Sequence, residues 1–200
     1  MKNNRQYAQM LCAAKEKLSG RDPAEIARAA GLLWNGRTFE AVTLGIPIQI
    51  HWPDCEIEPQ LDMWHCLTIL QYLAGAKGTP PAGRFICLSD FREGGLVRGS
   101  SFDRENDRII GMIGKNDAAA IQKAAAELGG TVISGKADMT IRFSFLPDFP
   151  LMLNLWLEDE DFPASGKVLL DAAMESAMQV EAAGTAAGIL LAMLEEKLQQ

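Results

Sequence analysis

The segment from Phe145 to Asp171 constrains the fold more than any other part of the chain. It reads FLPDFPLMLNLWLEDEDFPASGKVLLD, an apolar run that follows two prolines, ends at four consecutive acids and then resumes. The run Leu151–Leu157 is apolar on both faces, which is typical of a strand in the interior of a sheet. The preceding run Met139–Phe145 alternates apolar and polar residues, as a strand with one buried and one wet face does. We therefore expect two adjacent strands joined by a turn at 147–150.

The other segments predict helices and shorter strands. Helical spacing of apolar residues predicts helices near 7–18, 23–30, 61–74, 100–113, 118–128 and 180–198. Alternation predicts a hairpin of strands 37–44 and 46–52 around Gly45, and short strands at 85–88 and 168–170. Pro47 cannot donate a ladder hydrogen bond, which predicts that its strand is an edge strand. The expected fold class is α+β, an antiparallel or mixed sheet packed with helices, in a single domain over residues 1–200.

Composition and charge restrict the class of protein. A net charge of −7 argues against a nucleic-acid binder, which needs a basic face. No apolar run approaches the roughly 18 residues of a membrane span, and the N-terminus lacks the apolar region of a signal peptide. The four cysteines are scattered without a C-x-x-C pair, as reduced thiols are. We expect a cytoplasmic protein that contacts neither a membrane nor nucleic acid.

Three segments carry a family resemblance: 44–54, 71–80 with 91–95, and 149–171. Together they resemble the DUF3786 family, which is found mainly in anaerobic bacteria, and the resemblance runs from about residue 5 to residue 195. Some members of the family carry an added iron–sulfur module, and through them the resemblance implies a link to anaerobic redox or corrinoid metabolism. The scattered cysteines of this chain do not supply such a module. At 171–174 and 180–182 the chain has DAAM and VEA, where related sequences tend to have Asp-Ala-Ser-Ala and Thr-Glu-Asp.

The loop 75–80 is the first candidate binding site, because Lys77 lies between glycines and Thr79 follows it. The loop follows a helix, whereas a phosphate-binding loop precedes one and directs backbone N–H groups at the anion. The favoured interpretation is a helix C-cap with Lys77 near the negative end of the helix dipole, and the alternative is a contact to an anionic ligand. Arg92 belongs to the same group of resembling segments and is a second candidate.

Acidic residues supply two further candidates. Asp171 follows an apolar strand and precedes a helical segment, so it is either an N-cap or a polar group that faces a cleft. The acids Glu158–Asp161 could bind a hard cation or act as a general base. The simpler interpretation is an exposed turn that keeps the end of an apolar strand solvated.

A metal site receives little support. His51, Cys55, His65 and Cys66 match no standard spacing of zinc ligands. His65 and Cys66 are adjacent on a predicted helix and should point about 100° apart, with Cys66 toward the core and His65 at the surface. We expect no metal ligands among these residues, and no cofactor is assigned.

The expected function is binding of a small molecule, or of a partner such as a redox or corrinoid protein. The predicted ligand-binding residues are Lys77, Thr79, Arg92 and Asp171. One alternative is an enzyme whose cleft joins the 75–80 loop to the acids 158–161. Another is a protein-interaction module with Trp34, Trp64 or Trp156 on an apolar surface. The sequence specifies neither a reaction nor an oligomeric state.

Overall fold

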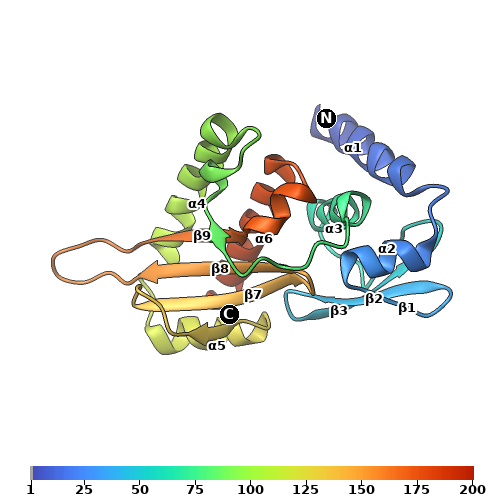
Figure 1. Ribbon diagram of the computed structural model, residues 1–200. Coiled ribbons are helices and arrows are strands. Elements are labelled where there is room, and N and C mark those ends of the chain that lie inside the picture. Colours follow the sequence, from blue (N-terminus) through green and yellow to red (C-terminus); the bar gives the residue numbers. More distant parts are fainter. Residues whose placement is uncertain (1) are drawn as a thin grey trace.

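Two antiparallel sheets lie side by side in the computed structural model, which describes residues 2–200 and their side chains from Arg5 onward (Figure 1). The smaller sheet has the order β1 (Leu33–Trp34), β2 (Thr38–Thr43), β3 (Ile46–His51) and β4 (Ile57–Glu58). The larger sheet has the order β5 (Phe85–Ile86), β9 (Ser165–Asp171), β8 (Phe149–Trp156), β7 (Met139–Leu146) and β6 (Thr131–Ile133). The α+β prediction is confirmed, and the expected sheet is divided into two.

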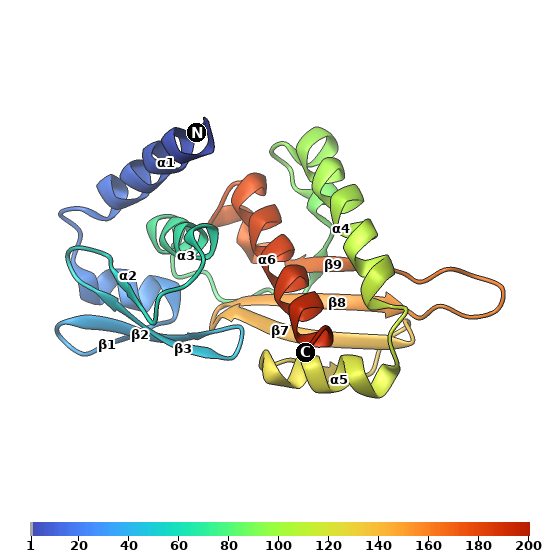
Figure 2. The ribbon, with the colours of Figure 1, turned by 180° about the vertical axis from the view of Figure 1, so that it is seen from behind.

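All six predicted helices are present. Helices α1 (Lys2–Leu18), α2 (Pro23–Ala30) and α3 (Met63–Gly75) lie beside the smaller sheet. Helices α4 (Ser100–Ile113) and α6 (Val180–Leu198) cross one face of the larger sheet, and α5 (Ala118–Glu127) lies near its β6 edge (Figure 2). Three short turns, η1 (Leu88–Asp90), η2 (Gly95–Gly99) and η3 (Ala172–Ser176), complete the described elements. None of the described helices has the length and apolar character that crossing a membrane requires.

The larger sheet supplies most of the core. Strand β8 lies between β7 and β9, as its apolar sequence predicts. The side chains of Ile141, Phe143 and Leu153 are buried on the face that α4 and α6 cover. Arg142 and Lys167 are exposed on the other face, where Met152 is only partly buried. The helices therefore cover one face, and the alternation predicted for β7 is confirmed.

The smaller sheet is joined to the larger one through its hairpin. The two-residue turn at Leu44 and Gly45 has positive φ at both positions, which the right-handed twist of a tight hairpin favours. The backbone N–H of Leu44 donates to the carbonyl oxygen of Ser144 at 3.1 Å. The predicted hairpin is confirmed. The edge-strand prediction for β3 is wrong, because β3 also pairs with β4; Pro47 is tolerated because that pairing involves only Gln49 and Ile50.

Helix α3 is more deeply buried than its sequence pattern predicts. His65, which was expected at the surface, is buried, as are Leu67, Thr68 and Tyr72. The helix is enclosed because α1 and α2 cover one side and α6 packs on another. The prediction that Cys66 points to the core and His65 to the surface is therefore wrong, since Cys66 is only partly buried.

Candidate functional site

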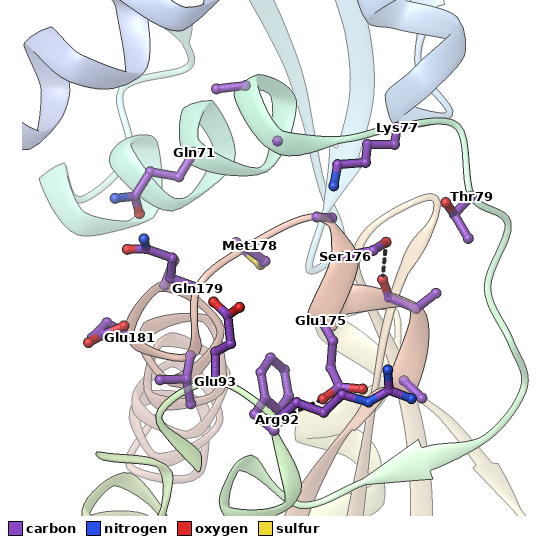
Figure 3. Close-up of a pocket in the computed structure, with 18 of the residues that line it drawn as sticks. Gln71, Lys77, Thr79, Arg92, Glu93, Glu175, Ser176, Met178, Gln179 and Glu181 are labelled. Carbon is purple, nitrogen blue, oxygen red and sulfur yellow. Dashed lines mark hydrogen bonds between the residues drawn. The ribbon is translucent and has the colours of Figure 1, made fainter. Parts of the chain in front are cut away.

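A cavity of about 1060 Å³ opens between α1, the C-terminal end of α3 and the N-terminal end of α6 (Figure 3). Its walls come from five segments of the chain. These are α1, the end of α3, the loop that leads to β5, the loop that leads into η2, and the stretch from η3 to the first turn of α6. The described segments that form it are far apart in the sequence, so the cavity is a product of tertiary packing.

The junction of two walls depends on a glycine. A Cβ atom on Gly75, the last residue of α3, would collide with the backbone carbonyl oxygen of Ala177. The turn between η3 and α6 therefore lies directly against the end of α3. The loop beyond α3 is fixed as well, since the N–H of Gly78 donates to the carbonyl oxygen of Ala29 at 3.1 Å. These contacts hold the 76–84 loop along one side of the cavity.

The cavity wall is basic although the chain as a whole is acidic. Five basic side chains line it, Lys17, Lys77, Arg84, Arg92 and Arg98, against the three acids Glu93, Glu175 and Glu181. The net charge of the chain is −7. Arg98 and Glu181 form an ion pair, and the other four cations form none within the described residues. An anion in the cavity would therefore meet four basic side chains that form no ion pair with a described carboxylate.

The first turn of α6 also faces the cavity. Gln179, Val180, Glu181 and Ala182 all contribute to the lining. Gln179 occupies the N-cap position and makes no side-chain hydrogen bond to the helix. The first N–H groups of this long helix therefore lack the side-chain acceptor that Ser, Thr, Asp or Asn would supply. This end of α6 adds partial positive charge to the same cavity.

One carboxylate has a structural role in the wall. Oε1 of Glu175 accepts the backbone N–H of Arg92 at 2.7 Å, which ties the loop before η2 to η3. The side chain of Arg92 extends beside that carboxylate (Figure 3). Ser176 donates to the carbonyl oxygen of Ala173 at 2.8 Å and thereby closes the η3 turn. Arg92 is thus held by its backbone while its guanidinium remains exposed.

The polar side chains of the cavity fall into two groups (Figure 3). Lys77, Thr79 and Arg92 lie on one side, which we call the basic end. The opposite side carries Gln71, Glu93, Gln179 and Glu181, and we call it the amide end. Glu175 lies beside Arg92 at the basic end, and Glu181 of the amide end is paired with Arg98, so Glu93 is the acid of the amide end that has no basic partner among the described residues.

Three of the four predicted ligand-binding residues line this cavity. Lys77, Thr79 and Arg92 come together there. Asp171 does not line it and is completely buried. Its carboxylate caps η3 by accepting the N–H of Ala173 and also accepts the N–H groups of Ala82 and Gly83. The N-cap interpretation of Asp171 is confirmed, and its carboxylate supports the loop behind the basic end.

The grouping of the 75–80 loop with the acids 158–161 is not found. Those acids lie on the loop between β8 and β9, which projects beyond the larger sheet (Figure 1). The cavity lies at the other end of β9, beyond Asp171. The acids of that loop are exposed, as the simpler interpretation predicts. The predicted cleft between loop and acids is therefore wrong, because the length of β9 separates them.

The tryptophans predicted for an interaction surface differ in exposure. Trp34 packs against Phe39 with ring centroids 4.9 Å apart, and Trp64 packs against Tyr7 at 5.7 Å. Trp156, at the end of β8, is 41% exposed. Trp34 and Trp64 are partly buried, so Trp156 is the most exposed of these three tryptophans.

The histidines and cysteines do not converge. Nε2 of His65 lies 2.8 Å from Oγ1 of Thr43, whereas His51 pairs with Glu58 at 3.3 Å. Burial lowers the pKa of His65 to about 4 and raises the pKa of the Cys66 thiol. Both side chains are therefore neutral near pH 7, and Cys66 is not activated as a thiolate. Within the described part of the chain, no three His, Cys, Asp or Glu side chains gather as metal ligands.

Several lining residues were not predicted. Lys17, Gln71, Arg84, Glu93, Glu175 and Gln179 were missed. One clue was available: no Ser, Thr, Asp or Asn precedes the helix that begins at Val180, so its start is uncapped. The stretches 171–174 and 180–182, where the chain departs from related sequences, both contribute residues to the lining. Those departures therefore concern the wall of this cavity.

The comparisons with known proteins identify a family and no individual relative. No curated protein and no solved structure matches the chain. The family described as "Domain of unknown function (DUF3786)" matches residues 22–193, which include every described strand, helices α2 to α5 and most of α6. The chain therefore belongs to the DUF3786 family.

Proposed function

We propose that the protein binds an anionic small molecule in the cavity between α1, α3 and α6. The observation that carries this proposal is the set of four basic side chains, Lys17, Lys77, Arg84 and Arg92, that line it without an ion pair among the described residues. Lys and Arg are the usual partners of phosphate and carboxylate groups. The chain is acidic overall, so these basic side chains are not part of a generally basic surface. Their concentration in one cavity supports a specific binding site there.

The size and lining of the cavity support a ligand larger than a single ion. Its volume of about 1060 Å³ lies at the upper end of the range of roughly 300–1,000 Å³ for small-molecule sites. Apolar side chains also line it, among them Met10, Phe91 and Met178. A ligand with an anionic group and a less polar body fits this combination.

The metabolic setting suggested by the family resemblance, anaerobic redox or corrinoid chemistry, remains part of the proposal. Absorbance spectroscopy and elemental analysis of the purified protein test it directly. A bound chromophore or metal would support that setting. A colourless, metal-free preparation from anaerobically grown cells would count against a tightly bound redox group and leave the anion-binding proposal in place.

The binding proposal is tested with inorganic phosphate as the probe, followed by amide chemical shifts in solution. We expect shifts in the amides of the segments 77–84, 91–93 and 175–182, which contain most of the lining residues, apart from Pro80 and Pro81, which have no amide N–H. Lys77→Ala should weaken phosphate binding about threefold or more, and Lys77→Ala with Arg92→Ala about tenfold, as the loss of partly exposed charge contacts implies. The fold should be unchanged, because both side chains are exposed.

Lys123→Ala is the matched control, since Lys123 is exposed on α5 and does not line the cavity. It should bind phosphate as the unmodified protein does. The proposal fails if phosphate shifts no amide at the cavity, or if the three variants bind it equally well.

A further inference from the structure

We infer that the ligand of this cavity carries an amine or a similar N–H donor at the end opposite its anionic group. The inference rests on the proposed function and specifies the chemical class of the ligand. It follows from the amide end of the cavity, where Gln71, Glu93 and Gln179 present acceptor oxygens that are not engaged elsewhere.

The three cavity carboxylates are not equivalent. Glu175 accepts the backbone N–H of Arg92, and Glu181 pairs with Arg98. Glu93 forms no hydrogen bond or ion pair with another described residue, although five basic side chains line the same cavity. In Figure 3 its carboxylate points into the cavity, between Gln179 and Glu175. Glu93 is thus the one acid of the described lining that remains available to a ligand.

A free carboxylate in an anion site lowers the affinity of the site for anions. It repels a purely anionic ligand and so weakens its binding, since like charges in a partly enclosed site disfavour one another. The same carboxylate attracts an ammonium group and accepts its hydrogen bonds. Glu93 therefore favours a ligand with separated opposite charges over a simple anion.

The two glutamines extend this preference. Gln71 comes from α3 and Gln179 from the turn before α6, so the two amides belong to separate walls (Figure 3). Neither side chain makes a hydrogen bond within the described residues. Each amide oxygen can accept from a ligand N–H, as the Glu93 carboxylate can. The basic end and the amide end together match an amino-substituted phosphate or carboxylate.

The test compares alkyl phosphates with ω-aminoalkyl phosphates of two to six carbons, which covers a range of separations between the charged groups. Affinities are measured by calorimetry or amide chemical shifts for the unmodified protein, Glu93→Gln and the control Glu105→Gln. Glu105 is exposed on α4 and does not line the cavity. At one or more chain lengths the aminoalkyl phosphate should bind at least about fivefold more tightly than the alkyl phosphate of the same length. This is the size of effect expected for one partly exposed charge contact.

Glu93→Gln should reduce that preference severalfold, because glutamine keeps an acceptor oxygen but loses the negative charge, and it should leave alkyl phosphate binding equal or stronger, because the repulsive carboxylate is gone. Glu105→Gln should keep the preference. Equal affinity for both series at every length, or a preference that Glu93→Gln leaves undiminished, would overturn the inference while phosphate binding still supported the proposed function. Failure of both series to bind at the cavity would overturn both the inference and the proposed function.

Discussion

Asp171 Oδ2 accepts the backbone N–H of Gly83 at 2.7 Å, and this bond joins the end of β9 to the loop that carries the basic end of the cavity. Oδ1 of the same carboxylate accepts the N–H groups of Ala82 and Ala173, at 2.8 and 2.9 Å. The carboxylate is fully buried. Asp171 therefore positions the loop residues around Arg84 and has no direct contact with the cavity.

Asp171→Ala should destabilise the protein strongly. The substitution leaves three backbone N–H groups without their acceptor, that of Ala173 in a buried place and those of Ala82 and Gly83 in partly buried ones, which we expect to cost roughly 2–4 kcal/mol. Urea unfolding measures this loss. Asp117→Ala, which removes the exposed N-cap of α5, should cost only about 1 kcal/mol. Equal losses in the two variants would contradict the positioning role of Asp171.

Two glycines of α6 should respond to alanine in opposite directions. A Cβ on Gly184 would lie 2.6–2.8 Å from ring atoms of Phe102 on α4, whereas a Cβ on Gly188 would meet nothing within 4 Å. Gly188→Ala should stabilise the helix by about 0.5–1 kcal/mol, because alanine is the better helix former. Gly184→Ala should destabilise by about 1–2 kcal/mol through overpacking against α4. Thermal unfolding of the two variants measures the difference, and a gain in both would show that Phe102 moves freely.

Gly75→Ala should disturb the cavity itself. Its Cβ would collide with backbone atoms of Ala177, which cannot turn away as a flexible side chain can. We expect a loss of about 1–3 kcal/mol and a shift of the turn before α6, visible as chemical shift changes at 177–182. Gly111→Ala is the control, since its Cβ would meet only an ordinary contact at 3.7 Å. If Gly75→Ala keeps both the stability and the phosphate affinity of the unmodified protein, the two walls are not rigidly joined there.

Local patterns predict the elements of this fold well, because helix caps and periodicity act over a few residues. Asp22 and Gly31 bound α2 as their residue types predict. Strand β6 was missed, since its three residues follow a glycine pair and are all exposed, which leaves no alternation to detect. His65 was predicted at the surface because helical periodicity assigns one face of a helix to the core and the opposite face to solvent. Helix α3 is enclosed on several sides, so this assumption does not hold for it.

The cavity was only partly predictable. Lys77, Thr79 and Arg92 were found because they lie in segments that resemble the family. Lys17 was missed because nothing in its local sequence distinguishes it from an ordinary surface charge, and Glu93 was missed although it follows Arg92 in the same resembling segment 91–95. Their role depends on the packing of α1 and the η2 loop around the end of α3, which periodicity does not encode.

Buried His65 should make stability depend on pH. Its side chain is 3% exposed, and desolvation lowers its pKa from 6.5 to about 4, against an opposing effect of the Asp62 carboxylate. The unfolded chain therefore binds a proton on this residue at a higher pH than the folded protein does. Above pH 6.5 His65 is neutral in both states, and the folded state loses stability as the pH falls from 6.5 toward 4.

Between pH 7 and pH 5 this residue should cost the protein about 2 kcal/mol, measured as the difference in unfolding free energy in urea. His65→Gln should lose that part of the pH dependence, because glutamine does not titrate and can still hydrogen-bond to Thr43. His51→Gln is the matched control, because it removes the other histidine of the chain, which lies on β3 and not on α3. An equal fall in stability in the unmodified protein, His65→Gln and His51→Gln would contradict the prediction. It would mean that groups other than His65 cause the loss of stability in acid.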